Sequence, residues 1–187
     1  MTRDQAYEIL TKYMKGENYI THSLAVEAIM KGLAKRLAPD EVEYWGIAGL
    51  LHDLDEEQCD WEHDLSVHGP TSVEILKKEG IADPVLFGAI CAHNPKSGVK
   101  AKTKIQYALL AADPMSGFLK AVAQIYPDKK IASVKRKSVI KRFNEARFAK
   151  GANRDYMESI EFTGLMLEDL IDIGLEEMCA ISDELGL

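Results

Sequence analysis

Cysteine is scarce in this sequence, and no two cysteines have the spacing of a metal site. The three residues, Cys59, Cys91 and Cys179, are odd in number and lie far apart. A disulfide framework, a structural zinc site or an iron–sulfur cluster needs paired or closely spaced cysteines. We therefore expect none of these sites, and we expect a protein of a reducing compartment.

Long apolar runs and a secretory signal are absent as well. The opening residues Met1 to Gln5 lack an apolar core, and no stretch reaches the roughly 20 apolar residues that cross a bilayer. The sequence thus predicts a cytoplasmic protein with no membrane partner. The net charge of −7 argues against general binding to nucleic acid, so we do not expect a nucleic-acid partner either.

Period-two alternation, internal repeats and low-complexity linkers are missing too. Apolar residues instead recur every three or four positions, as Leu24, Ala28 and Ile29 do, which is the spacing of a helix. A chain of 187 residues has the length of one domain. We predict an all-α, single-domain protein over residues 1–187, with seven to nine helices, and a homo-oligomer is compatible with this reading.

Several helix ends are marked by local signals. Thr2 and Gln5 have the spacing of a capping box, and Asp83 before Pro84 has the order of an N-cap and a first helical residue. Thr21 is expected to cap the next helix, which would place His22 in its first turn. Pro114 is expected to kink or interrupt a helix at Asp113, because proline lacks the N–H that the helix needs.

Histidines and aspartates gather at these expected helix ends. A lone histidine at a helix end is more often a cap or a surface residue than a ligand, but six such residues together indicate a metal site. Imidazoles combined with carboxylates suit Zn, Fe, Mn or Ni. His63, in the polar stretch Glu62–Asp64, is expected to be solvated and is left out of the set. The six residues are His22, His52, Asp53, His68, His93 and Asp113.

The order of these residues resembles the HD superfamily of metal-dependent phosphohydrolases. That family has a histidine early in a helix, a His-Asp doublet and a distant aspartate, which correspond here to His22, His52-Asp53 and Asp113. Many members insert two further histidines, matched by His68 in His-Gly-Pro and His93 in Ala-His-Asn. The resemblance covers about residues 18–115 and looks closest to small predicted HD hydrolases, with C-terminal helices expected over 133–187.

The resemblance implies a helical bundle with a metal site between helix ends. It implies two divalent ions (Mn, Fe, Zn, Ni or Mg), the first held by His22, His52, Asp53 and Asp113. Asp53, the expected catalytic residue, would bridge to a second ion held by His68 and His93. Such a centre hydrolyses a phosphate ester by attack of an activated water. The implied substrate is a small phosphorylated molecule or a nucleotide.

Two local features leave alternatives open. Asp55 and Glu56 follow the doublet and could hold an imidazole N–H, or they could form an exposed acidic turn. Pro114 departs from the family, whose members generally continue the helix after the last aspartate, so it could tilt Asp113 into the site or misplace it slightly.

A basic segment follows the last candidate ligand. This segment runs from Lys129 to Arg154 and contains a single acidic residue, Glu145. Its excess of positive charge indicates a local anion site or a solvated helix face. We expect a phosphate clamp there, which favours a hydrolase over two other readings, an HD-domain di-iron oxygenase and a metal-dependent binding or signalling module. The candidate phosphate-binding residues are Lys137, Lys141, Arg142, Arg147 and Arg154.

Overall fold

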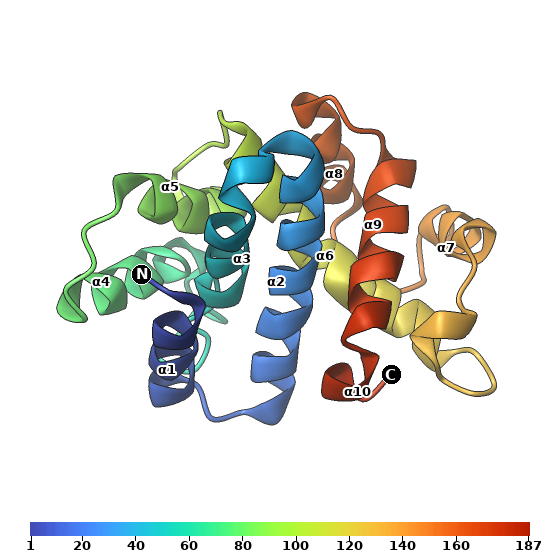
Figure 1. Ribbon diagram of the computed structural model, residues 1–187, viewed down its shortest axis with the longest axis horizontal. Helices are drawn as coiled ribbons and strands as arrows, with labels where there is room; N and C mark the ends of the chain where they lie inside the picture. The colour runs from blue at the N-terminus through green and yellow to red at the C-terminus, as the bar shows by residue number, and fades with distance from the viewer.

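The long helix α2 runs through the middle of the molecule, where α3, α6 and α9 pack against it (Figure 1). The computed structural model describes residues 1–187, which form helices and connecting turns and no β-strand, so the predicted all-α class is confirmed. Five short 3-10 helices lie between the α-helices. The α-helices are α1 (Arg3–Tyr13), α2 (Glu17–Leu37), α3 (Val42–Leu51), α4 (Pro70–Lys78), α5 (Pro84–His93), α6 (Lys104–Gln124), α7 (Arg136–Phe143), α8 (Arg154–Glu158), α9 (Leu167–Ala180) and α10 (Ser182–Leu185).

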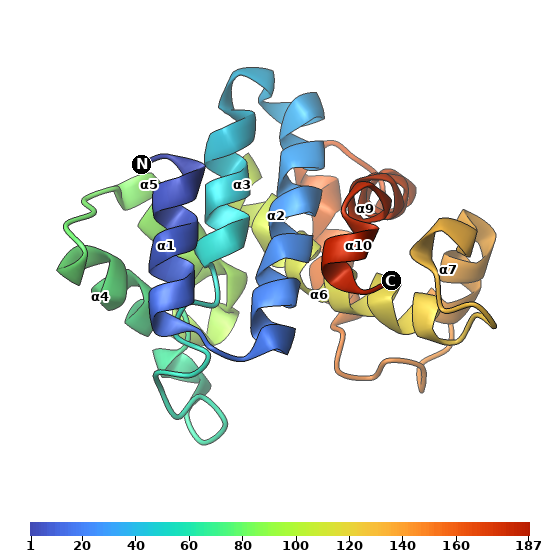
Figure 2. The same ribbon diagram turned by 60° about the horizontal axis from the view of Figure 1, so that its bottom comes forward.

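Helices α1, α3 and α2 lie side by side, and both views agree on this order (Figures 1 and 2). The close approach of α2 and α3 depends on Gly49, since a Cβ atom there would lie 2.8 Å from the carbonyl oxygen of Val26. Gly174 has the same role between α9 and α6, where a Cβ atom would lie 2.5 Å from Leu119 Cδ1. Small residues at these two contacts let the helices approach.

One hydrophobic core joins the N-terminal and C-terminal helices. The cluster includes Leu50 of α3, Phe118 of α6 and Leu170 of α9, all fully buried. Burial of such side chains is the main force that holds the helices together. The three cysteines are unpaired, and none of the helices combines the length and apolar character needed to cross a membrane.

Two predicted helix starts are confirmed. Thr2 and Gln5 exchange hydrogen bonds as a capping box at α1, and the Asp83 carboxylate accepts from the backbone N–H groups of Val85 and Leu86 at α5. The cap assigned to Thr21 is wrong. Helix α2 already begins at Glu17, and the Thr21 hydroxyl donates to the Glu17 carbonyl inside the helix. His22 consequently lies in the second turn.

The interruption expected at Pro114 is also wrong, because α6 runs unbroken from Lys104 to Gln124. Proline inside a helix costs about 3 kcal/mol through its missing N–H and its steric clash. Here the buried side chains of Leu109, Met115 and Phe118 hold both halves of α6 against the core. Pro114 itself lies on the other side of the helix, where it lines a cavity.

Candidate metal centre

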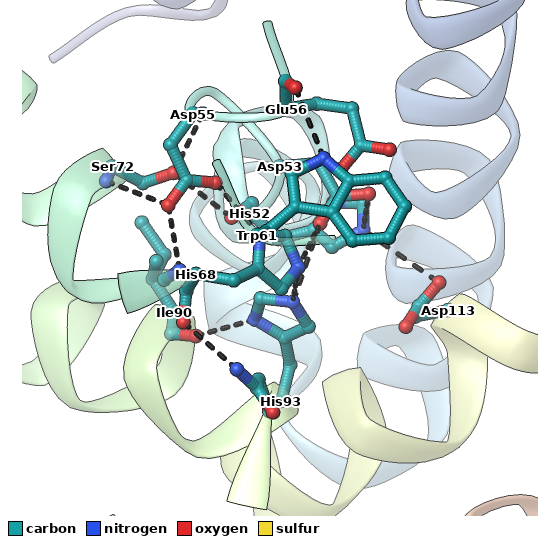
Figure 3. Close-up of polar contacts among 12 residues, drawn as sticks. His52, Asp53, Asp55, Glu56, Trp61, His68, Ser72, Ile90, His93 and Asp113 are labelled. Carbon is teal, nitrogen blue, oxygen red and sulfur yellow. Dashed lines mark hydrogen bonds and ion pairs between the residues drawn. The ribbon is translucent and has the colours of Figure 1, made fainter. Parts of the chain in front are cut away.

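The six predicted ligand residues converge at one place, although five separate segments carry them (Figure 3). His22 comes from α2 and the His52-Asp53 doublet directly follows the last residue of α3. His68 precedes α4, His93 is the last residue of α5, and Asp113 lies in the middle of α6. The expectation that every ligand sits at a helix end therefore fails for His22 and Asp113, which point inward from helix interiors.

In all four histidines of the set, Nδ1 contacts another group of the protein and Nε2 faces the candidate metal centre. His52 Nδ1 donates to the Gly49 carbonyl at 2.8 Å, and His93 Nδ1 donates to the carbonyl of Ile90. A carbonyl oxygen only accepts, so Nδ1 carries a proton in both rings, and Nε2 is the nitrogen that can bind a metal once it is deprotonated. A neutral imidazole held in this way is ready to bind a metal through Nε2.

The other two imidazoles are oriented by side chains. His68 Nδ1 lies 2.9 Å from Asp55 Oδ1, and His22 Nδ1 lies 3.1 Å from Ser116 Oγ. Because the Ser116 hydroxyl donates to the Asp113 carbonyl, its oxygen is free to accept from His22. Ser116 was not identified from the sequence, although it lies three residues after Asp113 and hence on the same side of the helix.

The first group of ligand atoms surrounds Asp53 Oδ2. This oxygen lies 3.3 Å from His22 Nε2 and 3.1 Å from His52 Nε2. Asp113 Oδ1 completes the group, 3.2 Å from His22 Nε2 and 3.8 Å from His52 Nε2. Two imidazole nitrogens and two carboxylate oxygens thus face one point.

The second group surrounds the other oxygen of the same carboxylate. Asp53 Oδ1 lies 3.3 Å from His68 Nε2 and 3.2 Å from His93 Nε2, and these two nitrogens are 3.0 Å apart. Asp53 therefore directs one oxygen to each group. This arrangement is the one expected of a carboxylate that bridges two cations.

These spacings fit coordination to metal ions. Ligand atoms about 2.1 Å from a cation lie about 3.0 Å apart in an octahedron and about 3.4 Å apart in a tetrahedron, which matches most of the distances in both groups. In addition, His52 Nε2 and Asp53 Oδ1 are buried without a hydrogen-bond partner. Orphaned buried polar atoms are costly, and a bound cation would satisfy both.

Asp55 is a buried partner of the second group rather than part of an exposed turn. Its side chain accepts from His68 Nδ1, from the Gly69 backbone N–H at 2.7 Å and from the Ser72 backbone N–H at 3.2 Å. Burial works to raise the pKa of Asp55, but these bonds outweigh it and hold the pKa below its usual range. The carboxylate thus fixes His68 and the start of α4 together.

Glu56 lies on the other side of the doublet. Burial and the negative charge of Asp53 raise the pKa of Glu56 to about 7. The backbone of Glu56 accepts a hydrogen bond from the Trp61 indole, whose ring centre lies 6.3 Å from that of His68 (Figure 3). The segment between α3 and α4 therefore begins as one wall of the centre.

The aspartates also shift the titration of the histidines. Burial acts to lower the pKa of His22, but hydrogen bonds to Asp113 and Asp53 prevail and raise it to about 9. The same opposition raises the pKa of His52 to about 10, chiefly through the charge of Asp53. For His68, the nearby carboxylates of Asp53 and Asp55 outweigh burial and raise the pKa to about 11. Without metal, the centre therefore holds protons at neutral pH.

The five candidate cations of the basic segment do not line the cavities at this centre. Lys137, Lys141 and Arg147 are exposed, and Arg142 pairs with Glu145. The guanidinium of Arg154 donates to four backbone carbonyl groups, those of Phe143, Phe148, Ala149 and Ala152. None of the five candidate residues lines the cavities beside His22, so the expected phosphate clamp finds no support here. His63 is exposed and pairs with Asp60, away from the ligand groups.

A cavity of about 460 Å³ adjoins the centre, with His22 and Asp113 in its wall. The opposite wall comes from the segment that follows α7 and from the start of α8, a part of the chain remote from the ligand residues. Arg154 holds this segment in shape through the carbonyl groups named above. The lining residues from that side are Ala149, Gly151, Ala152, Asn153 and Tyr156.

Comparison with known proteins gives one match. The family model of the HD domain matches residues 19–134, which include all six predicted ligand residues. Searches of curated proteins and of solved structures find no match.

Proposed function

Because the chain belongs to the HD-domain family, we propose that it is a metal-dependent phosphohydrolase that cleaves a small phosphate ester or a nucleotide with two divalent cations. The single observation that carries the proposal is the division of the Asp53 carboxylate between two ligand groups. A carboxylate shared in this way keeps two cations a few ångströms apart, the separation that suits phosphoryl displacement.

Two cations held by these residues would lower the pKa of water and neutralise the charge on the phosphoryl oxygens. The chain's own residues supply the frame. Asp53 would set the distance between the ions, and Asp113 with His22 would hold the first ion beside the cavity of about 460 Å³. A cavity of this size suits a small molecule, because ligand pockets usually measure about 300–1,000 Å³.

The wall of that cavity favours a polar organic group with one flat or apolar face. Ala149, Gly151 and Ala152 leave room, Asn153 offers an amide, and the Tyr156 ring offers a surface for stacking. A sugar or nucleoside attached to the phosphate has this character. The substrate class proposed is thus a phosphate ester of a small hydroxylated molecule.

The test combines metal analysis with a phosphate-release screen. Protein purified without chelators should contain close to two divalent ions per chain and release phosphate from at least one ester in the presence of Mn²⁺ or Mg²⁺. The D53N variant should lose both properties. The oxygenase alternative has the same ligand set, and it would replace this proposal if the protein held two irons, consumed oxygen and released no phosphate.

A further inference from the structure

One side of α6 continues from the candidate metal centre into a second cavity. Asp113, Gly117 and Lys120 recur at intervals of four and three residues, which places them on one side of the helix. Ser116, which orients His22, lies between them in sequence. Gly117 and His22 line both the cavity at Asp113 and the second cavity, so the two cavities are neighbours on this side of α6.

The second cavity is smaller, about 130 Å³, and His22 forms part of its wall. Thr21 and Ser116 contribute hydroxyl groups, but both hydroxyls already donate to helix carbonyls. The remaining wall is largely apolar and comes from α2, α9 and the C-terminal residues. Lys120 is the only lysine or arginine among the residues that line either cavity.

Lys120 is partly buried and makes no ion pair or hydrogen bond. Two cations beside α9 are paired instead, Arg136 with Asp172 and Lys35 with Glu177. Helical side chains lean toward the N-terminus of their helix, and Asp113 lies about two turns toward the N-terminus of α6 from Lys120, so the lysine can reach in that direction. An ammonium group with three free donors beside a candidate metal centre is suited to bind an anion.

Gly117 leaves the space between Asp113 and Lys120 open. It is exposed, and a Cβ atom built there would meet no other atom within 4 Å. A glycine inside a helix has an energetic cost relative to alanine, and no packing contact at this position requires it. A substrate that extends from the candidate metal centre to Lys120 would pass over Gly117 and fill this open space.

We propose that Lys120 binds the phosphate group of the substrate on the side that faces away from the metal ligands, with Gly117 kept small to let the phosphate reach it. This inference rests on the proposed phosphohydrolase function, and it names a cation for the phosphate that the basic segment between Lys129 and Arg154 does not supply. Metals and lysine together would then surround the phosphoryl oxygens, where negative charge is concentrated.

The test uses inorganic phosphate as the probe and Mn²⁺-loaded full-length protein, with the dissociation constant measured by isothermal titration calorimetry. K120Q should bind phosphate roughly ten- to a hundredfold more weakly, which corresponds to the loss of one charge-assisted hydrogen bond. K120R should stay within a few-fold of the original protein. K137Q is the matched control, because Lys137 is exposed and lines neither cavity.

Metal content and the thermal unfolding midpoint should be the same in all four proteins, which separates anion binding from metal binding and folding. Equal phosphate affinity of K120Q and the original protein would overturn the inference, and so would an original protein that binds no phosphate. Phosphate release from an ester by the original protein would leave the proposed function standing in either case. Conversely, Lys120-dependent phosphate binding without any ester hydrolysis would refute the hydrolase and keep the anion site.

Discussion

At the scale of single residues, Asp53 is the most important for the candidate metal centre, because each of its two carboxylate oxygens faces a different ligand group. Loss of one histidine removes one ligand from one group, whereas a change at Asp53 affects both. The residues around it are fixed by neighbours close in sequence, as His52 is by Gly49 and His93 by Ile90. Such local bonds explain why a short sequence pattern is enough to place these imidazoles.

Substitution of Asp53 should therefore abolish both sites. In D53N the amide keeps the shape of the side chain but loses the charge, so we expect the metal content to fall well below one ion per chain. Elemental analysis of the purified protein measures this. D60N is the control, since Asp60 is exposed and pairs only with His63. Two ions per chain in D53N would contradict the bridging role.

His68 and His93 should affect only the second ion. We expect H68A and H93A each to retain about one ion per chain, because the group formed by His22, His52, Asp53 and Asp113 stays complete. The fold should persist, which circular dichroism can verify. If both variants kept two ions and full activity, these two histidines would be ordinary helix-end residues.

Asp55 should matter for stability as well as for His68. In metal-free protein, D55A leaves His68 Nδ1 and two backbone N–H groups without their acceptor, so we expect the free energy of unfolding to fall by about 3 kcal/mol. The pKa of Asp55 is held below its usual range, so its contribution is present above the unfolded pKa and is lost as pH falls through the folded pKa.

Urea unfolding at several pH values measures this effect. The stability difference between the original protein and D55A should be largest at neutral pH and shrink below about pH 4, the unfolded pKa of an aspartate. A difference that stayed constant down to the lowest pH would show that the Asp55 carboxylate is not what stabilises the fold.

At the scale of helices, the sequence was most reliable where the signal was local. Thr2, Gln5 and Asp83 cap their helices as predicted, because a cap depends on three or four consecutive residues. The interruption predicted at Pro114 was wrong because the energetic cost of a proline is local. The burial of apolar side chains that outweighs this cost extends over the whole of α6. Thr21 misled for a similar reason, since α2 starts one turn earlier without any side-chain cap.

Two glycines in helix interiors should respond to alanine with opposite signs. G117A should raise the free energy of unfolding by about 0.5–1 kcal/mol, because the position is open and alanine has the better helix propensity. G49A should lower it, because the new Cβ atom would lie 2.8 Å from the Val26 carbonyl oxygen. Thermal or urea unfolding of the two variants decides this, and a destabilised G117A would mean that the face between Asp113 and Lys120 is not open.

At the scale of the whole molecule, the candidate centre combines residues that the sequence pattern identifies with neighbouring residues that no sequence pattern identifies. The six candidate ligand residues could be predicted because the HD pattern fixes their order, and the matching family covers residues 19–134. The cavity wall at Ala149 to Tyr156 and the position of Lys120 depend on how α7, α8 and α9 pack, which no local pattern encodes.

Charge density likewise gave a poor guide to the site. The segment around Arg142 and Arg154 is rich in cations, yet Arg154 lies 4.6 Å from the centre of the Phe118 ring and donates to backbone carbonyls. Its function is to hold the cavity wall in shape. By contrast, Lys120 of α6, which belongs to no charge run, lines a cavity together with His22.

Metal binding should be coupled to proton release by the whole centre. Burial alone would lower the pKa values of His22 and His52, but Asp53 and Asp113 raise them to about 9 and about 10, so both rings are protonated at pH 7 in the metal-free protein. A cation binds the neutral imidazole and must displace these protons. The affinity for metal should therefore rise with pH across the neutral range.

Titration calorimetry of Mn²⁺ into metal-free protein at pH 7, in two buffers of different ionisation enthalpy, counts the protons. We expect more than one proton released per chain and a smaller number at pH 9, where the first of these histidines is already half deprotonated. D113N should release fewer protons at pH 7, because Asp113 is one of the two carboxylates that hold the protons on His22. An identical binding enthalpy in both buffers would show that the metal-free histidines are neutral and that the aspartates do not govern their charge.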